Sequence, residues 1–317
     1  MIRTREIVIV ATLACVIAGC AHAPSNARSG SLTARPDTAQ PLAWSADDSV
    51  RVATLQRDGR SVTGMHAVLW APRDSITDDS LRAVLAGVER GLAMVKQLIG
   101  APLAWQRIGN GRVVYYLAAD RFVSHASGTG AVFISFWRVG QGTAPFLHEA
   151  SHELLAPQRP FNPWEFSDSV TQRQRAESSP LWLLEGLPDY LAQLAASRAG
   201  VREGDVFDAG DRTKVDSVCA ARVRAAPLAA AAVGTIGGAG RPPQLFTTER
   251  GTVAPVFYPC SHSFTKHVVE KIGLDRVVAL FPSIKSDDWQ RALSARGGSL
   301  DELRSEWAHR IGLPPSR

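Results

Sequence analysis

The sequence predicts an α+β protein in which a small mixed sheet with one covering helix is followed by a mainly helical C-terminal lobe. Of the 317 residues, 45% are hydrophobic and 21% are charged, as in ordinary globular proteins. Short β-rich stretches and one strongly periodic helix fill the first half of the chain, whereas helical patterns fill the second half. We therefore expect an α/β lobe to about residue 160 and a helical lobe over residues 161–317.

The first residues have the layout of an export signal. Two arginines precede the apolar run Ile7–Ile17, which is too short to anchor a chain across a bilayer. The segment Ile17–Cys20 reads Ile-Ala-Gly-Cys and resembles the lipobox of bacterial lipoproteins. This resemblance implies that residues 1–19 are removed and that Cys20 carries lipid. The alternative is an uncleaved membrane helix with a chance cysteine.

The lipobox resemblance also implies a location. A lipidated Cys20 would hold the protein on a membrane outside the cytoplasm, and Ala21 in place of Asp favours the outer membrane. Residues 20–46 are rich in small and polar residues without an apolar period, so we expect a flexible tether before a folded domain over residues 47–317. The excess of 35 basic over 30 acidic residues comes from scattered arginines, which predicts no nucleic-acid partner.

The elements of the first lobe follow from local patterns. Leucine and valine recur every three or four residues from Leu81 to Leu98, which predicts a helix that Thr77 caps and Gly100 ends. We expect strands on both sides of it, with a turn at Asp58-Gly59. The predicted strands are Val50–Leu55, Thr63–Trp70, Val113–Ala118 and Ala131–Trp137.

The second lobe reads as helices around an irregular segment. A helix begins near Ala144 with Thr143 as its cap and stops at Pro157. Ser197–Ala254, rich in Ala, Gly and Pro, is predicted to be irregular. The remaining predicted helices are Pro180–Ala196, Ser261–Ile272, Asp275–Phe281 and two around Trp289 and Trp307. Cys219 and Cys260 suggest one disulfide in an oxidising compartment, with two buried free thiols as the alternative.

The stretch His148-Glu149-Ala150-Ser151-His152 carries the chemistry. Residues four apart share a helix face, so both imidazoles can hold one metal ion while Glu149 reaches water bound to that ion. Catalytic zinc requires a third protein ligand. Glu185, in an apolar helix, is the expected ligand, and Asp189 one turn later can accept the second ring N–H of a histidine ligand. Glu177 is the alternative third ligand.

The pairing of this motif with Trp182-Leu183-x-Glu185-Gly186 and a following Tyr190 resembles the gluzincin zinc metallopeptidases of the thermolysin-like superfamily. The resemblance implies a zincin-like fold. It also implies that His148, His152 and Glu185 bind zinc, that Glu149 is the catalytic base and that Asp189 supports the first histidine. Pro188 departs from the family pattern and predicts a kink in the helix.

Further residues complete the predicted site. Either Tyr258 or His262, four residues apart, can donate a hydrogen bond to the oxyanion of a transition state, although packing and surface roles are equally open. The strand Ala131–Trp137 is expected to border the cleft, where an extended peptide adds as an antiparallel strand.

The sequence thus favours an exported, lipid-anchored zinc metallopeptidase that acts on a peptide or protein substrate. Two alternatives remain: a binding lipoprotein that keeps the peptidase fold without turnover, and a zinc amidase acting on cell-wall peptide.

Overall fold

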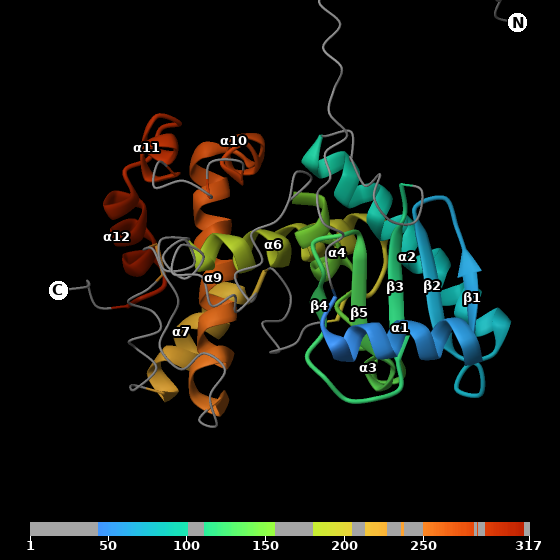
Figure 1. Ribbon diagram of the computed structural model, residues 1–317. Helices are drawn as coiled ribbons and strands as arrows, with labels where there is room; N and C mark the ends of the chain where they lie inside the picture. Colours follow the sequence, from blue (N-terminus) through green and yellow to red (C-terminus); the bar gives the residue numbers. More distant parts are fainter. Residues whose placement is uncertain are drawn as a thin grey trace, which may run out of the picture. The chain divides into compact units, whose positions relative to one another are not determined.

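The computed structural model describes residues 44–100, 111–155, 180–204, 213–226, 236–237, 250–281, 284 and 289–313, all within the compact unit Leu42–Arg317. The fold is mixed α+β, as predicted, with a five-stranded mixed sheet before a mostly helical C-terminal region (Figure 1). The predicted export signal and Cys20 lie outside the described residues. Within the described part of the chain, no helix is long and apolar enough to cross a membrane.

The sheet has the strand order β1-β2-β3-β5-β4. Its strands are β1 Gly59–Thr63, β2 Ala67–Pro72, β3 Val113–Ala118, β4 His125–Ala126 and β5 Ala131–Ser135. The central strands β2, β3 and β5 are parallel, whereas the edge strands β1 and β4 are antiparallel to their neighbours.

The expectation that an extended peptide adds to the strand Ala131–Trp137 does not fit the sheet, because no edge of this strand is free. β5 is an interior strand that pairs with β3 on one side and with β4 on the other. It ends at Ser135, and Trp137 belongs to the short helix α3, Phe136–Gln141, which Gly142 ends in the left-handed conformation. The free edge at this end of the sheet is β4, a strand of two residues that the sequence analysis missed because so short a strand has no readable pattern.

Helices cover both faces of the sheet, and α2, Asp78–Ile99, is the predicted periodic helix. The side chain of Thr77 accepts the N–H of Ser80 and Gly100 ends the helix in the left-handed conformation, as expected. Its apolar face packs with Leu69, Tyr115 and Leu117 in the main core. On the opposite face, α1, Ala46–Asp58, packs Val52 and Leu55 over Tyr116 and Phe133.

The prediction of a strand over Val50–Leu55 is therefore wrong. Asp48 donates its backbone N–H to the side chain of Ser45, which caps α1, and two aspartates stand in the first turn. Val50 points to solvent, whereas Val52 and Leu55, three residues apart, are buried. Helical spacing and the cap thus decide the conformation over β propensity.

Asp58-Gly59 is not a hairpin turn but the junction from α1 to β1. A Cβ at Gly59 would lie 2.4 Å from the carbonyl oxygen of Leu55, so glycine allows the strand to leave the helix at close range. The hairpin that does form joins β1 to β2 at residues 64–66.

The C-terminal region contains α6 Leu181–Ala199, α7 Val215–Ala225, α9 Arg250–Ile272, α10 Leu274–Val278, α11 Trp289–Ser294 and α12 Leu300–Arg310. The expected irregular segment Ser197–Ala254 thus contains α7 and the start of α9. α9 begins eleven residues before the predicted Ser261 and passes through Pro255 and Pro259, where packing against α6 and α7 supports it. The predicted disulfide is confirmed: Cys219 on α7 is bonded to Cys260 on α9.

Candidate metal centre

Helix α4, Phe146–Leu155, presents the two histidines and is held at its start from two sides. The hydroxyl of Tyr115 on β3 donates to the carbonyl of Phe146 at 3.0 Å. Glu203, in the segment after α6, accepts the backbone N–H groups of Leu147 and His148 at 2.8 and 3.0 Å through Oε1. Carboxylates are stabilising at helix N-termini, so this contact sets the start of α4.

The expected cap at Thr143 is not formed, because the Thr143 hydroxyl has no hydrogen-bond partner among the described residues. Glu203 takes the role from a distant part of the chain and satisfies two N–H groups, whereas a hydroxyl cap satisfies one. Burial raises the pKa of Glu203 to about 8, against the lowering effect of the N–H groups of His148 and Leu147.

The two imidazoles lie side by side on α4 as the four-residue spacing predicts. Their Nε2 atoms are 3.1 Å apart and their ring centroids 4.8 Å apart. Glu185 on α6 points at the same place, with Oε2 at 3.7 Å from Nε2 of His148 and at 3.6 Å from Nε2 of His152. His148 and Glu185 are buried, and His152 is partly exposed.

This triangle of ligand atoms fits a metal ion. A tetrahedral ion with bonds of about 2.0–2.1 Å holds its ligand atoms about 3.3–3.4 Å apart, and the three separations here lie on both sides of that value. Among the described residues, no other group of histidine, cysteine, aspartate and glutamate side chains converges in this way. His148, His152 and Glu185 can therefore hold one metal ion.

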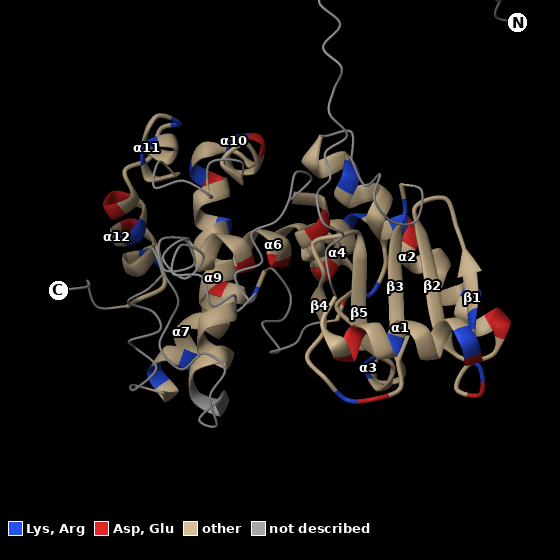
Figure 2. Cartoon of the chain, viewed as in Figure 1, with Lys and Arg blue, Asp and Glu red and all other residues tan. Residues whose placement is uncertain are grey.

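Asp189 lies where the sequence analysis placed it, one turn after Glu185 on α6. Its Oδ1 is 2.7 Å from Nδ1 of His148, so Nε2 of the same ring is left to face the metal position. Burial alone would lower the pKa of His148, but Asp189 and the carboxylates of Glu149 and Glu185 outweigh burial and raise the pKa to about 10. The centre thus favours a positive charge. Acidic residues of α4 and α6, drawn in red in Figure 2, lie in the region where these helices approach one another.

Glu149, the predicted base, is 4% exposed and follows His148 on α4. It is part of the same buried acidic environment, because its charge contributes to the raised pKa of His148. The site thus combines three potential metal ligands, one carboxylate that contacts a ligand and one further carboxylate beside them.

Helix α6 contributes residues to this centre from one face and packs against another helix with its other face. Glu185 and Asp189, four residues apart, face α4, whereas Trp182, Gly186 and Tyr190, also four apart, face α9. Trp182 packs on Phe264 with ring centroids 4.6 Å apart. A Cβ at Gly186 would lie 2.4 Å from the carbonyl oxygen of Ser261, so glycine permits the close approach of α9. α6 is continuous through Pro188.

Glu153, the residue after His152, was not predicted as part of the site. Its carboxylate accepts the N–H of Gly128 at 2.6 Å and that of Gly130 at 2.7 Å, in the turn between β4 and β5. Burial raises the pKa of Glu153, against the lowering effect of these two N–H groups. Both partners are backbone N–H groups, so the sequence carried no signal for this role.

The predicted oxyanion donors lie on α9. His262 is 1% exposed and packs edge-on against Tyr190, with ring centroids 6.2 Å apart, and Tyr258 packs against Phe257. These contacts place His262 on the side of α6 that faces α9. The oxyanion role of Tyr258 or His262 stays a prediction. Glu177, the alternative third ligand, lies outside the described residues.

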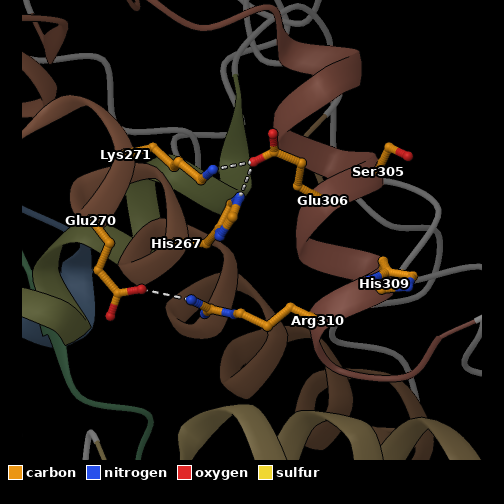
Figure 3. A pocket seen from close by; sticks show the side chains of 7 residues that line it. All are labelled: His267, Glu270, Lys271, Ser305, Glu306, His309 and Arg310. Atoms are coloured by element: carbon orange, nitrogen blue, oxygen red, sulfur yellow. Dashed lines mark hydrogen bonds and ion pairs between the residues drawn. The ribbon is translucent and has the colours of Figure 1, made fainter.

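A second cluster of charged residues lines a pocket between α9 and α12 (Figure 3). Lys271 contacts Glu306 at 2.7 Å and Arg310 contacts Glu270 at 2.6 Å. His267 lies 3.6 Å from Glu306. Each of these pairs joins a residue of α9 to a residue of α12.

Comparisons of this chain with models of protein families, with curated proteins and with solved structures found no match.

Proposed function

We propose that this protein is a zinc-dependent metallopeptidase with a zincin-like fold, acting outside the cytoplasm. The observation that carries the proposal is the convergence of His148, His152 and Glu185 within a triangle of tetrahedral dimensions, beside a buried Glu149. Two histidines and a glutamate form one of the ligand sets of catalytic zinc, and such a set leaves a position open for water.

The residues of the chain divide the chemistry between them. His148, His152 and Glu185 would hold zinc, which would act as a Lewis acid that polarises a carbonyl and lowers the pKa of water to about 7. Glu149 takes the proton of the attacking water and passes it to the leaving amine. Asp189 keeps His148 in the tautomer that ligates through Nε2. No covalent bond between protein and substrate is required.

Among the described residues, one edge of the sheet lies beside the centre. α4 packs next to β4 and β5, and β4 is the edge strand. We infer that a peptide adds to β4 through backbone hydrogen bonds, so that side-chain pockets decide the sequence preference. This replaces β5, the strand expected from the sequence, as the substrate-binding edge.

Export and lipidation at Cys20 are part of the proposal and rest on the sequence of residues 1–20. The disulfide between Cys219 and Cys260 supports an oxidising compartment.

The test is hydrolysis of a mixed peptide library by the zinc-loaded protein, read by mass spectrometry. We expect cleavage by the wild type, retention of zinc but loss of cleavage in Glu149→Gln, and full cleavage in the control Glu270→Gln, which removes a carboxylate on α9. Cleavage by Glu149→Gln at the wild-type rate would show that Glu149 is not the base.

The same assay separates the alternatives. A binding protein with this fold would hold zinc and bind peptides without cleaving any of them. An amidase would cleave cell-wall peptide crosslinks and leave the linear library intact. Either result would replace peptidase activity as the function of the centre.

A further inference from the structure

The edge strand β4 is too short to hold its own position. It consists of His125 and Ala126, which pair with Phe133 and Val132 of β5. A ladder of two residues is weak by itself, because isolated short strands are marginal in water. Its place in the fold must come from side chains around it.

One anchor holds the strand from the side of α1. Nε2 of His125 contacts Oδ2 of Asp48 at 3.0 Å, and its Nδ1 lies 2.9 Å from the carbonyl of Val123. The imidazole also stacks on Phe133 with ring centroids 5.2 Å apart. These contacts hold His125 of β4 against α1, the helix that covers this face of the sheet.

The second anchor is Glu153, and it comes from the metal-binding helix itself. Both carboxylate oxygens are used: Oε1 accepts the N–H of Gly128 and Oε2 that of Gly130. The two N–H groups can converge on one carboxylate because both glycines adopt positive φ, 73° and 87°, which other residues rarely do. Glu153 is 7% exposed, so these charge-assisted bonds lie out of water.

This arrangement joins the edge strand to the metal ligands through one residue. His152 holds the metal position, and the next residue, Glu153, holds the turn at the end of β4. We propose that Glu153 is a positioning residue that sets the register of the β4 edge, and of a peptide added to it, relative to the metal centre. The proposal rests on the peptidase function proposed above.

The chain contains a matched control at the other end of the sheet. Glu89 on α2 accepts the N–H groups of His66 and Ala67, both at 2.8 Å, in the turn between β1 and β2. The chemistry is the same: a helix carboxylate binds two backbone N–H groups of a strand connection. β1, however, is the opposite edge of the sheet, far along the strand order from β4.

The experiment compares Glu153→Gln with Glu89→Gln. A carboxamide keeps the shape but replaces one acceptor oxygen by a donor and removes the charge. In Glu153→Gln one of the two N–H groups loses its partner, because each oxygen accepts one of them. In Glu89→Gln the oxygen at the Oε1 position can still accept both N–H groups, but without the charge that strengthens these bonds. With a peptide that the wild type cleaves, we expect Glu153→Gln to raise KM about tenfold, with kcat within about twofold and zinc content unchanged. Glu89→Gln should keep both kinetic constants while its thermal stability falls.

A milder second variant covers the case in which Glu153→Gln does not fold. Ser127→Ala removes a hydroxyl that accepts the N–H groups of Thr129 and Ala131 in the same turn and that lies 3.4 Å from Oε1 of Glu153, while the Glu153 carboxylate itself stays in place. It should raise KM in the same direction by a smaller factor. An unchanged KM in the folded Glu153 variant, or in Ser127→Ala, would overturn the proposal, and so would an equal rise in Glu89→Gln.

The outcomes distinguish this inference from the function on which it rests. Absence of any cleavage by the zinc-loaded wild type would overturn the peptidase function and the positioning role together. Cleavage that depends on Glu149 but has the same KM in the wild type and the Glu153 and Ser127 variants would overturn the positioning role alone.

Discussion

At the scale of single residues, the contact between Asp189 and His148 is the most informative one outside the ligand set. A carboxylate on the second ring nitrogen fixes the tautomer and orientation of a ligating histidine and strengthens it as a ligand. The distance of 2.7 Å between Oδ1 and Nδ1 puts Asp189 within reach of that ring nitrogen.

We therefore expect Asp189→Asn to weaken zinc binding by about 10- to 100-fold without unfolding the protein. The measurement is the zinc dissociation constant from competition with a graded chelator. Asp79→Asn, whose side chain is 97% exposed on α2, is the control and should bind zinc as the wild type does. An equal dissociation constant in the wild type and Asp189→Asn would make Asp189 an ordinary helix residue.

The residues of the centre divide into those that a sequence can reveal and those that it cannot. His148 and His152 share one helix, so their spacing alone predicts that they meet, and Glu185 stands out as a carboxylate in an apolar helix. Glu203 and Glu153 bind backbone N–H groups of segments distant in the chain. Backbone partners leave no trace in residue types, so these two roles could not be predicted.

At the scale of elements, the packing of α6 against α9 depends on Gly186. A methyl group there would lie 2.4 Å from both the carbonyl oxygen of Ser261 and Oγ1 of Thr265. We expect Gly186→Ala to push the helices apart and to lower the free energy of unfolding by about 1–3 kcal/mol. The shift would also displace Glu185, so zinc affinity should fall.

Gly87→Ala is the matched control for this prediction. Gly87 lies within α2, and a Cβ there would meet nothing within 4 Å. The substitution should raise the free energy of unfolding by about 0.5–1 kcal/mol, because alanine favours the helix and restricts the unfolded chain. Denaturant unfolding of both variants checks the pair. Equal stabilities would contradict the close packing of α6 on α9.

We expect the contact between Asp48 on α1 and His125 on β4 to make the free energy of unfolding depend on pH. Burial alone would raise the pKa of Asp48, but hydrogen bonds from His125, Ser45 and Arg51 outweigh it and lower the pKa from 3.8 to about 2. A lowered pKa stabilises the folded state above pH 4, and this contribution, about 2 kcal/mol, is lost as the pH falls from 4 to 2.

His125, the partner of Asp48, makes a contribution to stability that changes with pH in the opposite direction. Burial alone would lower the pKa of His125, but the contact with Asp48 outweighs it and raises the pKa. Its contribution is therefore present below pH 6.5 and lost as the pH rises through the raised pKa. Unfolding free energies between pH 2 and 9 should fall at both ends in the wild type, and both losses should shrink in Asp48→Asn. Parallel curves for the two proteins would exclude this link.

Elements whose hydrophobic pattern repeats over many residues could be predicted from the sequence. Short elements, and elements whose residues give conflicting signals, could not. α2 has buried residues from Leu81 to Leu98 and caps at both ends, so its pattern is read without tertiary knowledge. α1 contains valines, which favour β-strands, and only the cap at Ser45 indicates a helix. α9 contains two prolines that read as breaks, and its first half forms because other helices pack against it.

At the scale of the whole molecule, the disulfide between Cys219 and Cys260 closes a loop of 41 residues within the C-terminal helices. The double variant Cys219→Ser/Cys260→Ser should lower the free energy of unfolding by about 2–4 kcal/mol, since the unfolded chain gains conformational freedom. Denaturant unfolding with and without reductant checks this. Neither half of the bridge contributes a ligand, so the folded double variant should still bind zinc. Equal stability of the wild type and the variant would show that the bridge does not stabilise the fold.

The α+β class and the order of lobes were also predictable, because they depend on which half of the chain holds strand and helix patterns. The order of strands was not, since the place of β4 outside β5 depends on His125 and Glu153 contacts across the chain. For this reason the substrate-binding edge that we propose is β4, one strand beyond β5.

The position of zinc in the protein tests the proposed metal centre most directly. Crystals of the protein soaked in zinc can be measured at the zinc absorption edge, where an anomalous difference map locates the ion. We expect one strong peak about 2.0–2.2 Å from Nε2 of His148, Nε2 of His152 and the carboxylate of Glu185. A map with no peak at these three side chains, or with its strongest peak elsewhere on the protein, would contradict it.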